Sequence, residues 1–265
     1  DHECAQISAK WLAQNHTAAS VFVDQTIDER EMPIERARLT IDQVGLGIFA
    51  KTAALSPVKT RLAASIGKAE AEQFYHLSVL AIEQLALALP NAIRPYWAVA
   101  EAEGLDQPQW KKLPHFWTGD GDLGARLHQV YSRLRKNHGA AILIGTDSPQ
   151  LTPSLLEDTQ KRLAQDPTSV VLGPCSDGGF YLFAGGVDIP QSCWTSVTYS
   201  ENTTLRQLSY QLHQLNVKIH FLAEQQDVDV VEDLPRLQAK LAAEKTLLSA
   251  QKQLLDWLSR TASAT

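Results

Sequence analysis

Apolar residues along this chain gather into short continuous runs separated by longer stretches in which they recur at helical spacing. The runs predict strands over residues 44–50, 96–100, 140–145, 169–172, 180–183 and 218–222. The stretches between them predict helices over residues 67–89, 123–138, 203–215 and 231–260, with a further helix starting at Thr152-Pro153. This alternation predicts an α/β fold with a doubly wound, mostly parallel sheet, in which 44–50 and 140–145 are neighbouring central parallel strands.

Residues 1–43 have a different pattern. Cys4, Ile7, Trp11 and Leu12 fall at helical spacing, residues 20–24 could form a short strand, and residues 28–38 hold seven charges in eleven positions. The sequence therefore predicts an N-terminal appendage over 1–43. The main domain is expected over 44–265 and should end in a long C-terminal helix.

Composition narrows the class of protein. The 265 residues carry 24 Lys and Arg against 30 Asp and Glu, a formal charge of −6, which argues against a general nucleic-acid binder. The three cysteines lie too far apart for a disulfide framework or a zinc pattern, so plain thiols are expected. No apolar run approaches 18 residues, and the first residues do not read as a signal peptide. A cytoplasmic protein without a membrane span is expected, and a homo-oligomer is left open.

Ligands of such sheets bind beyond the carboxyl ends of the strands, and four polar clusters are expected there. The first is basic: Lys51 ends the first strand, and Lys59-Thr60-Arg61 lies on the loop into the next helix. These cations could neutralise a polyphosphate, or they could simply be solvated. The loop matches neither a Walker motif nor a dinucleotide fingerprint.

The other three clusters are acidic. Asp147 follows the most apolar strand and could bind Mg²⁺ or Mn²⁺, or it could cap the next helix. Asp177-Gly178-Gly179 lies between two strands and could receive a ligand, with Asp177 as a base, or form a simple hairpin turn. Asp229, within the acidic stretch 227–233, could bind metal, but its spacing to Glu232 equally fits a capping box.

Several of these motifs occur together in one known family. The string 48–51 with 58–62, Gly119–Gly124, Gly145–Pro149, the 173–182 stretch and 227–234 appear in the same order. Over residues 44–240 the chain resembles a bacterial family of glycosyltransferase-A-like transferases, among them selenodomain-associated glycosyltransferases. That family is similar to 2-phospho-L-lactate guanylyltransferases and other nucleotide-diphospho-sugar transferases. Two positions depart from its pattern, because Ser56 replaces a loop glycine and Val230-Val231 replaces Thr-Pro.

The resemblance implies a metal-dependent transferase with a nucleotide or nucleotide-sugar donor and a small-molecule acceptor. It implies a metal (Mg²⁺ or Mn²⁺) on Asp147 and Asp229, and catalytic roles for Asp177 and Lys59. The residues implied to bind the nucleotide are Lys51, Lys59, Thr60, Arg61 and Asp122. The residues implied to bind the acceptor are Asp177, Gly178 and Gly179. Asp122 could instead only cap the helix that follows it.

Two other functions stay open at this point. One is nucleotidyl transfer of the guanylyltransferase kind, in which a phosphorylated acceptor attacks a nucleoside triphosphate and pyrophosphate leaves. The other is a non-catalytic nucleotide-binding module, which the altered phosphate loop makes plausible.

Overall fold

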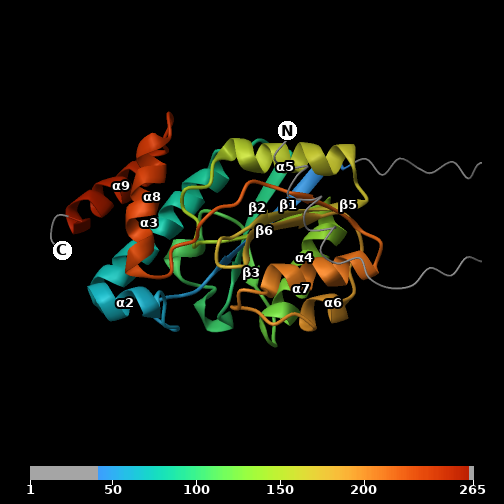
Figure 1. Ribbon diagram of the computed structural model, residues 1–265, viewed down its shortest axis with the longest axis horizontal. Coiled ribbons are helices and arrows are strands. Elements are labelled where there is room, and N and C mark those ends of the chain that lie inside the picture. Colours follow the sequence, from blue (N-terminus) through green and yellow to red (C-terminus); the bar gives the residue numbers. More distant parts are fainter. Residues whose placement is uncertain (1–40, 263–265) are drawn as a thin grey trace, which may run out of the picture. The chain divides into compact units, whose positions relative to one another are not determined.

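The computed structural model describes residues 41–262, and these form a sheet with helices on both faces (Figure 1). The predicted helix and strand within the N-terminal segment lie outside the described residues, so the appendage stays a prediction. No helix in the described part of the chain is long and apolar enough to cross a membrane.

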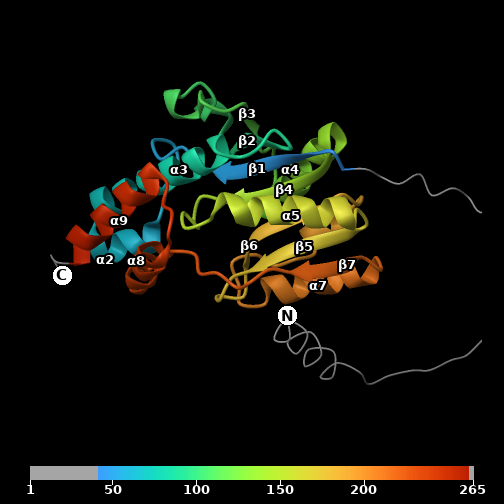
Figure 2. The same ribbon diagram turned by 90° about the horizontal axis from the view of Figure 1, so that it is seen from above.

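Seven strands make one sheet in the order β3-β2-β1-β4-β6-β5-β7, which Figure 2 shows from above. The strands are β1 (Gln43–Ala50), β2 (Ile93–Val99), β3 (His115–Trp117), β4 (Gly139–Gly145), β5 (Ser169–Pro174), β6 (Phe180–Gly185) and β7 (Lys218–Phe221). Strand β6 runs antiparallel to β4 and β5, and the remaining pairs are parallel. The mostly parallel α/β sheet is thereby confirmed. Strands β1 and β4 are parallel neighbours with Leu46 opposite Ile142, as the apolar runs predict.

Helices cover both faces of this sheet. The helices of the described residues are α2 (Thr60–Ile66), α3 (Lys68–Leu87), α4 (Leu123–His138), α5 (Pro153–Gln165), α6 (Gln191–Thr195), α7 (Thr204–Gln214), α8 (Leu234–Ala243) and α9 (Ser249–Ala262). Short 3₁₀ turns occupy Ala102–Gly104, Pro108–Trp110 and Val231–Asp233. Helices α3 and α5 share a core with one face of the sheet, and α4, α6 and α7 share a second core with the other face.

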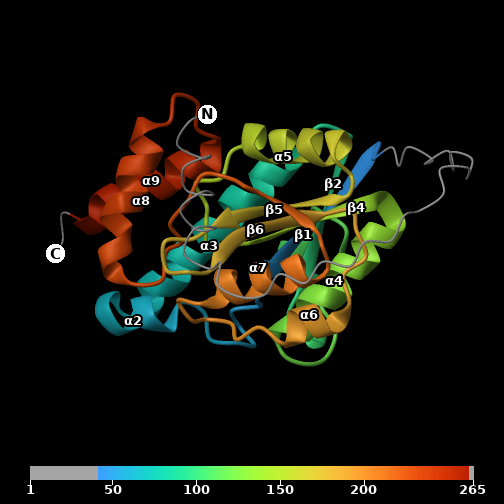
Figure 3. The same ribbon diagram turned by 45° about the vertical axis from the view of Figure 1, so that its right-hand side comes forward.

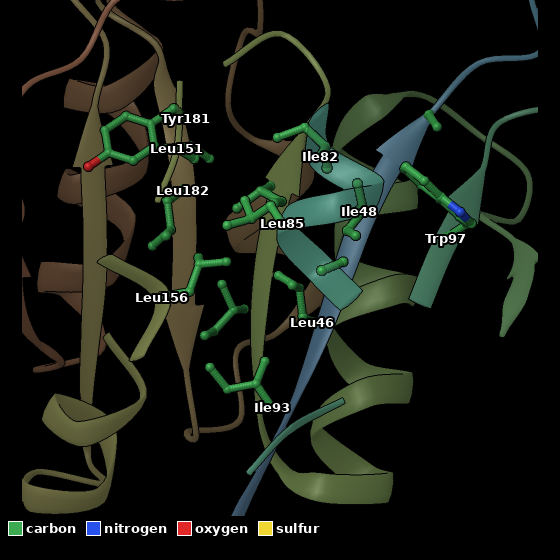
Figure 4. Packing of buried hydrophobic residues seen from close by; sticks show 14 of the residues in the cluster. Leu46, Ile48, Ile82, Leu85, Ile93, Trp97, Leu151, Leu156, Tyr181 and Leu182 are labelled. Carbon is green, nitrogen blue, oxygen red and sulfur yellow. The ribbon is translucent and has the colours of Figure 1, made fainter. Parts of the chain in front are cut away.

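The core on the α3 side shows why β1 lies in the middle of the sheet. Leu46 and Ile48 of β1 are fully buried against Ile82 and Leu85 of α3, as Figure 4 shows. A strand with helices over both faces needs apolar side chains on both sides, which is what the continuous run from residue 44 supplies.

The predicted single C-terminal helix over 231–260 is wrong. The chain forms a 3₁₀ turn, then α8, then a break at residues 244–248, and then α9 (Figure 3). Glu244 is extended (φ −74°, ψ 126°) and ends α8. The break lets α9 turn back and bury Leu254 and Trp257 with Phe74 of α3 in a third apolar cluster. If α8 and α9 formed one straight helix, the residues of α9 could not pack against both α3 and α8. The burial of these side chains therefore outweighs local helix propensity.

Candidate active site

The carboxyl ends of β1, β4, β5 and β7 lie at one edge of the sheet because these strands run in the same direction. Asp147 follows β4, the turn 175–179 joins β5 to β6, and residues 222–230 follow β7. The four clusters that the sequence indicates therefore meet at this edge.

The basic loop contacts the central carboxylate directly. Lys59 precedes α2 in a left-handed conformation (φ 49°), and its side chain is only 4% exposed. Its Nζ lies 2.6 Å from Oδ1 of Asp147 and also donates to the carbonyl of Val228. The Asp147 side chain is 53% exposed. The first and second clusters are thus joined by a half-buried ion pair.

A second ion pair joins the same loop to the fourth cluster. Nη1 of Arg61 donates to Oδ2 of Asp229 over 3.0 Å, and both side chains are at least half exposed. The carboxylate of Asp229 is therefore not used as a helix cap. Instead, Asp233 reaches back and accepts the backbone N–H groups of Asp229 (2.9 Å) and Val230 (3.0 Å). A shared metal on Asp147 and Asp229 stays a prediction.

The end of β1 is held by Tyr75 of α3. Its hydroxyl accepts the N–H of Lys51 (2.8 Å) and donates to the Lys51 carbonyl (2.7 Å). Burial raises the pKa of this phenol well above its usual value, so it stays protonated and can serve both bonds. The side chains of Lys51 and Thr60 are exposed beside this anchored backbone.

A cavity of about 260 Å³ opens at the carboxyl edge between β4 and the turn that joins β5 to β6. Its apolar wall includes Phe49, Leu127 and Leu143, and its polar residues include Asp147, Asp177, Gly179 and Asp227. Three of the predicted clusters, through Asp147, Asp177 and Asp227, therefore face one pocket. The basic residues Lys51, Lys59, Thr60 and Arg61 are not among its lining residues.

The turn at Asp177 is both a hairpin turn and part of the pocket. Oδ1 of Asp177 accepts the N–H of Gly179 (2.8 Å), and the N–H of Cys175 donates to the Gly179 carbonyl (3.0 Å). Gly178 has φ +90°, and a Cβ there would lie 2.1 Å from the carbonyl oxygen of Asn202. The glycine therefore allows the loop before α7 to pack against the turn.

Asp227 belongs to the fourth cluster, but sequence reasoning gave it no role and assigned the metal to Asp229 instead. After β7, Gln225 bridges to Cys175, and this pairing carries Asp227 to the polar end of the pocket. Burial, and then the negative charge of Asp177, raise the pKa of Asp227 from 3.8 to about 6. The signal in the sequence was its place at the start of the acidic stretch 227–233 after the last strand, and spacing alone did not separate it from Asp229.

Cys175 is a second residue whose place the sequence did not reveal. It is a free thiol and 5% exposed, and burial raises its pKa above the usual range. Its Sγ and one carboxylate oxygen each from Asp177 and Asp227 all lie within 4.8 Å of one another. Among the described residues these three side chains form a group that could hold a metal ion.

Asp122 caps α4, because its Oδ1 accepts the N–H of Ala125 over 2.8 Å. A contact of Asp122 with a nucleotide stays a prediction. The loop before α7 supplies Tyr199, Ser200 and Glu201 to the pocket, none of which the sequence indicated. Ser200 has a positive φ of 62°, a conformation that a non-glycine residue adopts at a cost in backbone energy.

Comparison with solved structures shows that this arrangement of strands and helices has the nucleotide-diphospho-sugar transferase fold. A structure from Desulfovibrio desulfuricans G20, described as a "putative nucleotide-diphospho-sugar transferase", superposes with a TM-score of 0.72 at 21% identity. The match covers 82% of this chain and 97% of that one. CMP:2-keto-3-deoxy-manno-octonic acid synthetase, solved with CTP, matches with a TM-score of 0.50 at 15% identity over 76% of this chain and 98% of that one. At these identities the likeness shows a shared fold.

Residues 88–201 match the family model described as "Uncharacterized protein conserved in bacteria (DUF2064)". That range includes Asp122, Asp147 and the turn with Asp177. No curated protein matches the sequence. The family match and the fold together confirm the resemblance that the motifs indicate.

Proposed function

We propose that this chain is a metal-dependent transferase that moves a sugar from a nucleotide-sugar donor to a small-molecule acceptor. The observation that carries the proposal is the acidic pocket at the carboxyl edge of the sheet, with a basic loop beside it, on this fold. In the proposed reaction the pocket carboxylates would bind an acceptor hydroxyl, and the cations of the loop would neutralise the donor phosphates.

Lys59 and Arg61 are assigned to the donor diphosphate, with Lys51 and Thr60 beside them. Without a ligand, each of the two cations is paired with a carboxylate, Asp147 or Asp229. Phosphate oxygens are equally good partners for an ammonium or a guanidinium group, so a bound donor can take over either cation. Asp147 and Asp229 would hold Mg²⁺ or Mn²⁺, which supplies positive charge to the departing diphosphate.

The turn 177–179 is assigned to the acceptor. Oδ1 of Asp177 is used by Gly179, which leaves Oδ2 for an acceptor hydroxyl at the polar end of the pocket. In the reaction the acceptor oxygen bonds to the anomeric carbon and its proton passes to Asp177. The bond from that carbon to the phosphate oxygen breaks, and the nucleoside diphosphate leaves with the electron pair. Asp122, Leu127 and Phe49 would border the nucleotide or sugar.

The first test is binding. A thermal-shift panel of nucleoside triphosphates and nucleotide-sugars, with and without Mn²⁺, should show one donor that stabilises the protein only with metal. A ligand at 100 times its Kd adds about 2.7 kcal/mol, which for a domain of this size raises Tm by roughly 5–11 °C. A panel in which no nucleotide gives a metal-dependent shift would refute the proposal.

The second test is turnover. Asp177→Asn keeps a side-chain oxygen that accepts the Gly179 N–H, but its amide is a far weaker base than a carboxylate. Turnover should therefore fall by about 10²–10⁴-fold while donor binding persists. Asp158→Asn on α5 is the matched control, because Asp158 is 65% exposed and pairs with Lys161 on its own helix. Equal turnover in both variants would remove Asp177 from the reaction.

Nucleotidyl transfer is the second candidate. It is favoured by the likeness to a synthetase solved with CTP and by the sequence Gly145-Thr146-Asp147, which lacks the Asp-x-Asp pattern of many glycosyltransferases. In that reaction an acceptor oxygen attacks the α-phosphorus of a nucleoside triphosphate and pyrophosphate leaves. Release of pyrophosphate from a triphosphate supports it, whereas release of a diphosphate from a nucleotide-sugar supports glycosyl transfer. Binding without either product would support a non-catalytic module.

A further inference from the structure

Two carboxylates at the polar end of the pocket lie close to a buried sulfur atom. Cys175 follows β5, Asp177 lies in the turn, and Asp227 comes from the segment after β7. One ligand atom from each lies within 4.8 Å of the other two. The three residues come from two chain segments about fifty positions apart, and the Cys175–Gln225 bridge holds those segments together.

This donor set differs from an ordinary magnesium site. Magnesium binds hard oxygen ligands in octahedral geometry, and a thiolate is a poor ligand for it. Zinc and cobalt accept one sulfur and two oxygens, with metal–sulfur distances of about 2.3 Å and metal–oxygen distances of about 2.0–2.2 Å. Ligands of one such ion lie roughly 3–4 Å apart, so the three atoms need to approach by only about 1 Å.

The two carboxylates can make the movement that would bring the three ligand atoms closer together. Asp177 is exposed and Asp227 is partly exposed, so both can change rotamer, whereas Cys175 is buried and fixed behind them. Three protein ligands leave at least one coordination position open, and both carboxylates line the pocket.

We propose that Cys175, Asp177 and Asp227 bind a divalent ion of zinc-like softness, with its open coordination position facing the pocket. The thiol proton is released to solvent when the ion binds. The site is distinct from the cation assigned to Asp147 and Asp229. This inference deepens the proposed function and rests on it for the role of the pocket. In that role, an acceptor with a hydroxyl or carboxylate oxygen would be bound between this ion and Asp177. A carboxylate has about four lone-pair positions, so Asp177 can serve Gly179, the ion and the acceptor together.

The test is titration of the full-length reduced protein with Co²⁺ and no nucleotide. Cobalt bound to a thiolate gives a near-ultraviolet charge-transfer band, which oxygen ligands do not give. We expect this band in the unmodified protein, its loss in Cys175→Ser, and its retention in the matched control Cys193→Ser, a buried free cysteine of α6. Asp227→Asn should keep the band but weaken Co²⁺ binding by about tenfold or more, as expected for loss of one charged ligand.

Competition identifies the preferred ion. Zn²⁺ should abolish the cobalt band at equal concentration, whereas millimolar Mg²⁺ should not. No band, or a band that survives Cys175→Ser with the circular dichroism of the folded protein, would overturn the inference. If Cys175→Ser does not fold, Cys175→Ala provides the same comparison, and Asp177→Asn should keep the band but weaken Co²⁺ binding as Asp227→Asn does. Because no nucleotide is present, a negative result leaves the transferase proposal standing, and a failed nucleotide panel leaves the metal result standing.

Discussion

The ion pair between Lys59 and Asp147 should respond very differently to loss of one partner or the other. The Lys59 side chain is 4% exposed, so an ammonium without its carboxylate would keep the Val228 carbonyl as its hydrogen-bond partner in the described part of the chain. Asp147 is 53% exposed, so a carboxylate without its lysine would be solvated by water. The cost of a lost partner depends on the burial of the group left behind.

The magnitudes follow from this asymmetry. Removing one partner of a fully buried pair costs about 3–5 kcal/mol, and screening on the exposed side of Asp147 reduces this. Asp147→Asn retains a neutral hydrogen-bond acceptor, so we expect a loss of about 2 kcal/mol in the free energy of unfolding. Lys59→Met keeps most of the buried stem near Phe74 and should cost about 1 kcal/mol or less.

Urea unfolding at pH 7 without divalent metal measures both values, and Tm should fall by roughly 4–8 °C for Asp147→Asn. The exposed pair supplies matched controls, because Arg61→Met and Asp229→Asn should each change stability by less than about 0.5 kcal/mol. If Lys59→Met destabilises the protein as much as Asp147→Asn, the reasoning from burial is wrong.

Three further predictions concern the same edge of the sheet. Because the pKa of Asp227 is raised from 3.8 to about 6, the free energy of unfolding of the wild type should fall as pH rises through 6. In metal-free unfolding experiments Asp227→Asn should therefore equal the wild type at pH 3. At pH 8 it should be about 1–2 kcal/mol more stable, after allowance for solvent screening. Gly178→Ala should lower the free energy of unfolding by about 2–4 kcal/mol in chemical denaturation, because the added Cβ would collide with the Asn202 backbone and the residue has a positive φ. In Gly179→Ala the added Cβ would meet the movable Asp177 carboxylate at 3.1 Å, so the loss of stability should be clearly smaller. Asp233→Ala removes the acceptor of two backbone N–H groups and should lower the free energy of unfolding by about 1–2 kcal/mol, with Glu232→Ala as a near-neutral comparison.

The sequence by itself determined six of the seven strands of the described sheet, most of the longer helices and the central pair β1 and β4, but not β3, α2, α6 or the break between α8 and α9. Both conclusions rest on local periodicity, and a continuous apolar run such as 140–145 has only one stable place, between two layers of helices. The same reasoning placed Asp147 and Asp177 at the carboxyl edge, because strand direction is enough to say where a strand's last residue points. Asp122 as a helix cap is equally local.

Tertiary structure decided which of those polar groups touch. Nothing local distinguishes Asp227 from Asp229; the bridge between Gln225 and Cys175 puts the first in the pocket, and Arg61 takes the second. The same pairing places Cys175, which the sequence predicts to be a plain thiol, beside two carboxylates. The sequence also has no local signal for the break between α8 and α9, because the break is stabilised by the burial of Leu254 and Trp257 against α3. Contacts between residues far apart in sequence depend on how whole elements pack, and a period of 2 or 3.6 residues carries no information about that packing.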